Sequence, residues 1–246
     1  MLFDDGYQFG IGAFETIAVQ NKIPILLEKH LKRLNNSLSF LKIDKIIDKK
    51  IVLDYVKNIK KQNYALKIIV SEKNTIIKTR ANPYINSKLY ESGFNLKYSS
   101  ILKNETSPFS YHKTLNYAEN ILEKRKAKIE NVDDFIFINT KGFISEGSVC
   151  NIFFINNEKI YTPSISSGIL PGIVRAYLCE SYNIEEKEIS PSNVEEMEEC
   201  FVTNSLMGIM PVKRLGDIEF IKHTITKILM QNYTSFIENN SKTTKT

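Results

Sequence analysis

Cysteine, histidine and long apolar runs are all scarce in this sequence. Its 246 residues include three histidines and three widely spaced cysteines, Cys150, Cys179 and Cys200, with no CxxC pair. A metal site is therefore not expected, and the cysteine pattern is typical of reduced thiols in the cytoplasm. The first residues carry no basic and then apolar secretion signal. No apolar run approaches the ~20 residues of a membrane span. We expect a cytoplasmic protein without a membrane segment.

A strong imbalance of charge is also missing. The chain has 33 Lys and Arg against 28 Asp and Glu, a net charge of 33 − 28 = +5. Its lysines are scattered, and the short clusters at residues 49–50 and 60–61 are typical of solvated helix faces. We expect no nucleic-acid partner, although a mildly positive protein suits small anionic ligands. Apolar residues make up 42 % and are spread throughout, which predicts an ordinary globular protein with a buried core.

Periodicity divides the first half into strands and helices. Residues 13–19 and 23–27 are β-rich runs around a polar turn and predict a hairpin. Leucines then recur at helical spacing and predict an amphipathic helix over residues 28–41. The remaining elements expected here are a helix over 46–60 and strands over 65–70, 74–78 and 94–98. Together they predict an N-terminal α+β domain over residues 1–102, followed by an irregular linker over 103–112.

The second half alternates between helices and strands and predicts a C-terminal α/β domain over residues 113–246. Proline and glycine open two of its helices. The expected helices are 117–129, 172–182, 191–199 and 218–236, and the expected strands are 135–138, 152–155, 159–162, 201–203 and 209–212.

Five short segments carry the chemistry. They are Lys-Thr-Leu-Asn-Tyr at 113–117, Ser-Glu-Gly-Ser-Val-Cys-Asn at 145–151, Gly-Ile-Val-Arg at 172–175, Thr-Asn-Ser at 203–205 and His-Leu-Lys-Arg-Leu at 30–34. One amine, one carboxylate, one fixed cation and two small-residue turns are the parts needed to hold pyridoxal 5'-phosphate. A lysine forms a Schiff base with the cofactor aldehyde, and a carboxylate keeps the pyridine nitrogen protonated. A cation and a glycine turn that opens a helix suit the phosphate. A lone lysine would be taken for a surface residue, so the ordered set carries the argument.

In this order, the set resembles the fold-type IV pyridoxal-phosphate enzymes from residue 4 to about residue 212. These include branched-chain and D-amino acid aminotransferases and aminodeoxychorismate lyase. The resemblance implies a two-domain α+β fold like that of D-amino acid aminotransferase, with the cofactor in the cleft between the domains, and a homodimer. The family usually has a strand pair before its Asp-Gly segment, which starts here at residue 4. We expect either a naturally short N-terminus or missing residues.

The resemblance assigns roles to single residues. Lys113 is the Schiff-base lysine and the later proton carrier, and Glu146 is the partner of the pyridine nitrogen. Arg33 binds the cofactor phosphate, although by itself it would be taken for part of a surface ion pair. Further phosphate donors are expected from the backbone of Ile173 and Val174 and from Asn204 and Ser205.

Four more residues receive weaker assignments. Tyr117 corresponds to a tyrosine that hydrogen-bonds the cofactor's phenolic oxygen, at a spacing one residue shorter, and is otherwise a buried aromatic. Thr16 is a candidate catalytic residue near the site. Arg80 is either a ligand of a substrate carboxylate or a surface cation at a strand end. His30 is expected to be structural.

The expected function is that of a lyase that converts 4-amino-4-deoxychorismate to 4-aminobenzoate and pyruvate on the folate route. The Asn-Ser-Leu turn at 204–206 is similar to that of the lyase, whereas the aminotransferases have Gly-Thr-Ala-Ala-type or Ser-Thr-Thr-type turns. The Arg-x-His carboxylate trap of the D-amino acid enzymes is missing from residues 78–84. The alternatives are an aminotransferase of branched-chain or D-amino acids, a pyridoxal-phosphate-binding protein without turnover, and a plain α+β scaffold.

Overall fold

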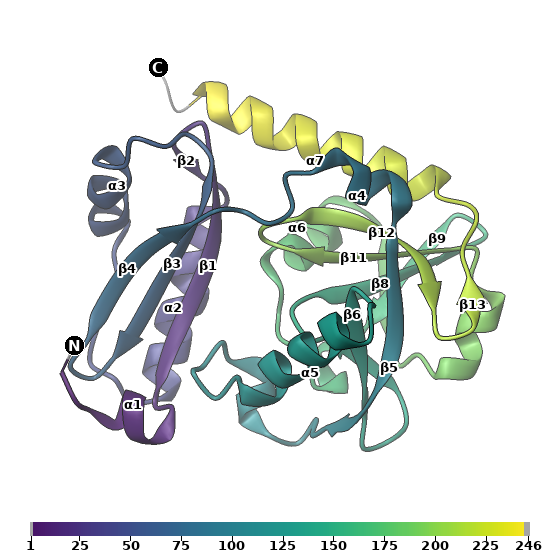
Figure 1. Cartoon of the computed structure of the whole chain (residues 1–246), viewed down its shortest axis with the longest axis horizontal. Helices are drawn as coiled ribbons and strands as arrows, with labels where there is room; N and C mark the ends of the chain where they lie inside the picture. Colours follow the sequence, from purple (N-terminus) through teal and green to yellow (C-terminus); the bar gives the residue numbers. More distant parts are fainter. Residues whose placement is uncertain (1, 244–246) are drawn as a thin grey trace. The chain divides into compact units, whose positions relative to one another are not determined.

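The computed structural model of the chain describes residues 2–243, with side chains for residues 2–239 (Figure 1). The described residues form two compact units. The first takes residues 2–83, 112–117 and 236–243, and the second takes 84–111 and 118–235. Each unit has its own sheet and its own apolar core.

The first unit is a four-stranded antiparallel sheet in the order β2-β1-β3-β4. Its elements are α1 (Asp5–Phe9), β1 (Gly12–Gln20), β2 (Ile23–Pro24), α2 (Leu27–Phe40), α3 (Lys49–Lys57), β3 (Tyr64–Ser71) and β4 (Thr75–Arg80). The predicted hairpin, the predicted helix over 28–41 and the strands at 65–70 and 74–78 are confirmed. The predicted helix over 46–60 is shorter than expected, because the Asp48 side chain caps it and accepts a hydrogen bond from the Ile51 amide.

Strand alternation gives this sheet two different faces. Apolar side chains of one face, including Ala13 and Ile17 of β1, pack with Leu31, Leu34 and Leu38 of α2 in the core of the first unit. Thr16 lies on the opposite face of β1. The register pairs Thr16 with Lys67, and Lys67 with Lys78, so that these three side chains share the face opposite α2.

Residues 112–117 extend the same sheet at the start of β1. The Phe14 amide donates to the Lys113 carbonyl at 2.9 Å, and the Leu115 amide donates to the Gly12 carbonyl at 2.8 Å. Ala13 and Thr114 form an antiparallel bridge between these two bonds. The position of the Lys113 backbone is therefore fixed by β1 of the first unit.

The second unit is a nine-stranded mixed sheet, in the order β10-β9-β8-β11-β12-β5-β6-β7, with β13 paired to β12. Its strands are β5 (Phe94–Lys103), β6 (Asp134–Asn139), β7 (Ile144–Gly147), β8 (Asn151–Asn156), β9 (Lys159–Pro163), β10 (Ile184–Lys187), β11 (Glu199–Asn204), β12 (Gly208–Leu215) and β13 (Ile218–Glu219). Its helices are α4 (Ser87–Ser92), α5 (Ala118–Ile129), α6 (Ile173–Ser181) and most of α7 (Thr224–Thr243), with 3₁₀ turns at Pro108–Tyr111, Ile165–Ser167 and Pro191–Glu196. The last residues of α7, from 236 on, belong to the first unit. The predicted helices 117–129 and 172–182 are confirmed as α5 and α6.

The two units divide the chain differently from the predicted domains 1–102 and 113–246 with their linker 103–112. Residues 84–102 lie in the second unit because β5 pairs in parallel with β12 and β6. Residues 112–117 lie in the first unit because they bond to β1. Neither pairing leaves a periodic signal in the sequence.

Two predicted helices are corrected. Residues 191–199 form only the 3₁₀ turn Pro191–Glu196, because β11 begins at Glu199 and pairs with β8. Residues 218–236 do not form one helix. A turn at Gly216, whose φ is +60°, leads into β13, and α7 begins only at Thr224. There the buried Glu199 carboxylate accepts hydrogen bonds from the Ile225 and Thr226 amides, and this carboxylate sets where the helix starts.

Candidate active site

Lys113 is half-buried, and two aromatic rings lie against its side chain. Its Nζ lies 4.6 Å from the centre of the Phe14 ring and 4.9 Å from that of Tyr117. The two rings contact each other edge to face at 5.1 Å. Tyr117 is half-buried, and its ring contacts both the Lys113 amine and the Phe14 ring. Its predicted bond to the cofactor's phenolic oxygen stays a prediction.

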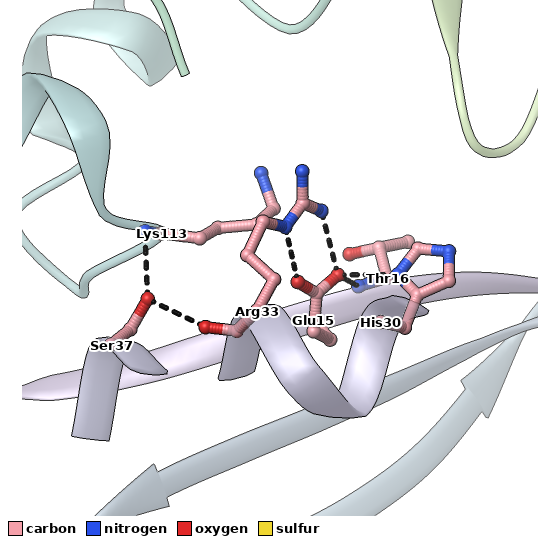
Figure 2. A network of polar contacts seen from close by, with 6 residues as sticks. All are labelled: Glu15, Thr16, His30, Arg33, Ser37 and Lys113. Atoms are coloured by element: carbon pink, nitrogen blue, oxygen red, sulfur yellow. Dashed lines mark hydrogen bonds and ion pairs between the residues drawn. The ribbon is translucent and has the colours of Figure 1, made fainter. Parts of the chain in front are cut away.

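Arg33 lies on α2 and forms a bidentate ion pair with Glu15 of β1 (Figure 2). Its Nε donates to Glu15 Oε1 at 2.6 Å, and its Nη2 donates to Oε2 at 2.9 Å. His30 Nδ1 lies 2.7 Å from the same Oε2. The ion pair that was the simpler expectation for Arg33 exists, but it is buried rather than on the surface, since Glu15 is 0 % exposed.

Protonation in this network follows from burial and charge. Burial alone would raise the pKa of the Glu15 carboxyl, but the Arg33 guanidinium and His30 outweigh it and hold that pKa well below its usual range. Burial lowers the pKa of His30, although the nearby Glu15 carboxylate acts to raise it. An ionised carboxylate only accepts, so a neutral His30 must carry its proton on Nδ1 and donate it to Glu15.

A row of cations occupies the sheet face that Thr16 shares. Lys67 is half-buried and its Nζ lies 4.5 Å from the centre of the Phe14 ring, the ring that Lys113 also contacts. Lys78 lies opposite Lys67 on β4, and Arg80 follows on the same face. Burial, then Lys78 and Arg80, lower the pKa of Lys67. Like charges placed opposite each other across strands repel, so this face suits an anion.

Glu146 of β7 is a buried carboxylate in the second unit. Its Oε2 accepts hydrogen bonds from the Leu170 amide at 3.0 Å and from Asn151 Nδ2 at 3.4 Å. Its Oε1 lies 3.4 Å from Lys103 Nζ. These contacts fix the position of the carboxylate, and a carboxylate is the group that a protonated pyridine nitrogen requires.

The N-terminus of α6 lies beside this carboxylate. Asn151 joins them, because its Nδ2 also donates to the Leu170 carbonyl at 3.0 Å. Gly172 is the N-cap and has no side chain to satisfy the first turn, so the amides of Ile173 and Val174 are among those that a helix leaves unbonded. A Cβ at Gly172 would collide with the Asn151 side-chain oxygen. Glycine is therefore required for this close approach.

The turn at residues 203–205 lies next to Asn151, because the register pairs Thr203 of β11 with Asn151 of β8. Glu146, Asn151, the start of α6 and this turn form the group of site residues in the second unit. The Thr203 hydroxyl is buried and has no hydrogen-bond partner among the described residues. Asn204 Oδ1 accepts from the amides of Leu206 and Met207 at 2.9 and 3.0 Å, so that its side chain closes the turn. The predicted phosphate contacts of Asn204 and half-buried Ser205 stay predictions.

The residues present fit pyridoxal 5'-phosphate. Taken by itself, the group in the first unit has a lysine amine and a guanidinium. The group in the second unit, taken by itself, has a fixed carboxylate, an uncapped helix N-terminus and a buried hydroxyl without a partner among the described residues. Helix N-termini and guanidinium groups are suited to phosphate. Within the described part of the chain, no group of three or more potential metal-ligating side chains lies together. None of the described helices is long and apolar enough to cross a membrane.

Several residues that lie near Lys113, Arg33 or Glu146 in the structure were not predicted as site residues from the sequence. Glu15 had a signal, since it is the one charged residue inside the apolar run 13–19. Lys67 had the same signal inside the run 65–70. Lys103 had none, because its contact with Glu146 depends on strand pairings between distant parts of the chain.

Comparisons with known proteins identify the family of the chain. The family model described as amino-transferase class IV matches residues 12–215. Aminodeoxychorismate lyase of Bacillus subtilis is 27 % identical over 240 residues, covering 89 % of this chain and 82 % of the relative. A protein of Thermotoga maritima named as a probable branched-chain-amino-acid aminotransferase is 27 % identical over 253 residues, covering 97 % and 90 %. The structure of Escherichia coli branched-chain amino acid aminotransferase superposes with a TM-score of 0.85 at 19 % identity, covering 96 % of this chain and 89 % of that one, and shows the fold alone.

Fold and residues together define a pyridoxal 5'-phosphate-dependent enzyme of fold-type IV. The chain belongs to the class IV aminotransferase family.

Proposed function

We propose that the protein is an aminodeoxychorismate lyase, which converts 4-amino-4-deoxychorismate to 4-aminobenzoate and pyruvate. The observation that carries this proposal is the row of cations Lys67, Lys78 and Arg80 on one sheet face, where Lys67 lies against the Phe14 ring that Lys113 also contacts. The substrate has two carboxylates, one on its ring and one on its enolpyruvyl arm, and two carboxylates need several cations. A branched-chain amino acid needs an apolar pocket for its side chain instead.

Two further observations support the lyase over an aminotransferase. The Bacillus subtilis relative with this name matches 89 % of the chain. The turn at 204–206 reads Asn-Ser-Leu, as the resemblance implies for the lyase, and Asn204 closes it through its side chain. The Thermotoga maritima relative favours the aminotransferase, which is therefore the competing outcome of the test.

Lys113 would bind the cofactor covalently through its amine and then act as a base. When bound, the cofactor supplies an electron sink, and Glu146 would keep its ring nitrogen protonated. Released by the substrate amine, Lys113 would take the proton from the carbon that bears this amine. The ether bond to the enolpyruvyl group then breaks, and this group takes up a proton to become pyruvate while the ring becomes aromatic. Thr16, which lies on the same sheet face as Lys67, would assist this proton transfer.

Arg33, the first amides of α6 and the turn at 203–205 would hold the phosphate. Their chemistry is complementary to a dianion, because a guanidinium offers N–H donors in a planar fork and a helix N-terminus offers backbone amides. We also propose that the enzyme works as a cytoplasmic homodimer. Light scattering after gel filtration should give twice the mass of one chain.

The test supplies one preparation with two sets of substrates. With 4-amino-4-deoxychorismate it should release 4-aminobenzoate and pyruvate in equal amounts, and with leucine or D-alanine plus 2-oxoglutarate it should show little transamination. Borohydride reduction followed by peptide mass spectrometry should place the cofactor on Lys113, and Lys113→Ala should lose both label and turnover. Brisk transamination without 4-aminobenzoate would replace the lyase with an aminotransferase.

The row of cations makes a separate prediction about substrate binding. Arg80→Ala and Lys67→Met should each raise the KM for 4-amino-4-deoxychorismate by about tenfold, as expected for the loss of a charge-assisted hydrogen bond. The absorption spectrum of the bound cofactor should not change. The matched control is Lys49→Met, which removes a lysine from a surface pair with Glu28 in the same unit. An unchanged KM would return Arg80 to the role of a surface cation.

A further inference from the structure

Glu15 is an unusual residue for the middle of a core strand. It is 0 % exposed, and its neighbours Ala13 and Ile17 on the same face of β1 belong to the apolar core. A buried ion pair often adds no stability over apolar residues of the same volume. Packing alone therefore does not explain a carboxylate at this position. The α2 residues that bind Glu15 indicate its role instead.

The carboxylate binds two α2 side chains that are three residues apart and share one helix face. Arg33 donates two parallel hydrogen bonds to it, of 2.6 and 2.9 Å, and His30 Nδ1 lies 2.7 Å from Oε2. The Thr16 amide adds a fourth contact, at 3.3 Å. Both oxygens are thus engaged, and a bidentate pair fixes the plane of the guanidinium as well as its position.

Fixing that plane also fixes where the rest of the guanidinium is directed. Glu15 accepts one hydrogen bond from Nε and one from Nη2. In Figure 2 the outer nitrogen of Arg33 points away from Glu15, and the Lys113 amine points the same way in this view. Ser37 links the two residues through the backbone, since its hydroxyl donates to the Arg33 carbonyl at 3.0 Å and accepts from the Lys113 amide at 3.3 Å.

We propose that Glu15 is a positioning residue for phosphate binding: supported by His30, it fixes the plane and position from which the Arg33 guanidinium binds the cofactor phosphate. This inference rests on the proposed function only in that the enzyme must bind pyridoxal 5'-phosphate. The sequence suggested a structural role for His30. In this proposal, His30 stabilises the Glu15 carboxylate, which in turn orients Arg33.

The experiment compares pyridoxal 5'-phosphate with pyridoxal, which lacks only the phosphate. The full-length enzyme is dialysed to equilibrium against graded concentrations of each, and the ratio of the two dissociation constants reports the contribution of the phosphate. Glu15→Gln keeps the size but sets an amide N–H against the donors of Arg33 or His30. It should weaken binding of pyridoxal 5'-phosphate by about tenfold or more, and that of pyridoxal by less than about twofold. A merely structural role would weaken both equally, and this outcome would overturn the proposal.

A double variant tests whether Glu15 acts through Arg33. Lysine cannot form the bidentate fork, so in an Arg33→Lys background Glu15→Gln should change the ratio by less than about twofold. If its full effect persists there, the proposal is wrong. The matched control is Glu28→Gln, which removes an exposed carboxylate from the same helix and should leave the ratio unchanged.

Two outcomes separate this inference from the proposed function. If the wild-type enzyme binds neither compound, the proposed function fails. If the wild type prefers pyridoxal 5'-phosphate and Glu15→Gln keeps that preference, only the inference fails. Should Glu15→Gln not fold, Glu15→Asp takes its place, because it keeps the charge but is one methylene too short for the observed contacts. If Glu15→Asp then showed the same ratio of the two dissociation constants as the wild-type enzyme, the positioning role would be wrong.

Discussion

At the scale of the residue, Glu146 shows how a carboxylate can be held ready for a cationic ring nitrogen. The Leu170 amide and Asn151 bind one oxygen, and Lys103 lies near the other. These contacts orient the carboxylate within the second unit. Lys103 also balances the negative charge, which lowers the cost of burying it.

Glu146→Gln should therefore keep the cofactor bound but lower turnover. The amide preserves the shape and loses the charge that holds the proton on the ring nitrogen. Loss of a charged hydrogen bond costs about 1.5–3 kcal/mol, which corresponds to roughly ten- to a hundredfold in rate. Steady-state kinetics together with the cofactor spectrum provide the check. Glu130→Gln removes a surface carboxylate paired with Lys97 in the same unit and serves as control. A fully active Glu146→Gln enzyme would show that the assigned role is wrong.

At the scale of the element, the start of α6 depends on one close approach. Gly172 leaves room for Asn151, and Asn151 in turn binds both Glu146 and the Leu170 carbonyl. A side chain at Gly172 would displace Asn151 and disturb the carboxylate and the helix N-terminus together. The sequence shows the glycine, but it does not show that an asparagine 21 positions earlier lies against it.

Gly172→Ala should weaken cofactor binding by about tenfold or more, since a displaced Asn151 loses hydrogen bonds worth on the order of 1 kcal/mol each and the phosphate loses its aligned amides. Equilibrium dialysis and a thermal melt measure the two effects. Gly142→Ala is the comparison, because a Cβ there meets nothing within 4 Å, although its φ of +88° is unfavourable for alanine. That variant should lose some stability and keep its cofactor affinity. Equal cofactor affinity in the two variants would contradict the role of Gly172.

The elements also show what a sequence can and cannot predict. The helix at 28–41 was found because Leu31, Leu34 and Leu38 repeat at helical spacing and all lie in the core. The helix expected over 218–236 was misplaced because its start is set by Glu199, which lies far away in sequence and accepts from the first amides of α7. Arg33 was singled out by its motif, but its bond to Glu15 depends on how β1 packs on α2. Local periodicity identifies elements, and tertiary contacts decide their ends and the partners of their charges.

At the scale of the whole molecule, all three histidines respond to acid in the same direction. Burial lowers the pKa of His30 although Glu15 pulls the other way, it lowers the pKa of His112, and it lowers the pKa of His223 with Glu199 opposing. In the unfolded chain a histidine has a pKa of about 6.5. Below this pH the unfolded chain binds protons that the folded chain does not, and the free energy of unfolding must fall.

The expected result is a loss of stability between about pH 7 and pH 5, by no more than about 1.4 kcal/mol per pH unit for each histidine. Glu15 does not contribute in this window. Its folded pKa is depressed, so its contribution is present above the unfolded value of about 4.3 and is lost only as the pH falls further. Thermal melts at pH 7.5, 6.5 and 5.5 measure the loss, and histidine NMR titration of the folded protein assigns it. A His30 that titrates above pH 7 would contradict the prediction, because Glu15 would then hold a charged imidazolium, and acidification from pH 7.5 to 6.5 would strengthen the pair instead of weakening the fold.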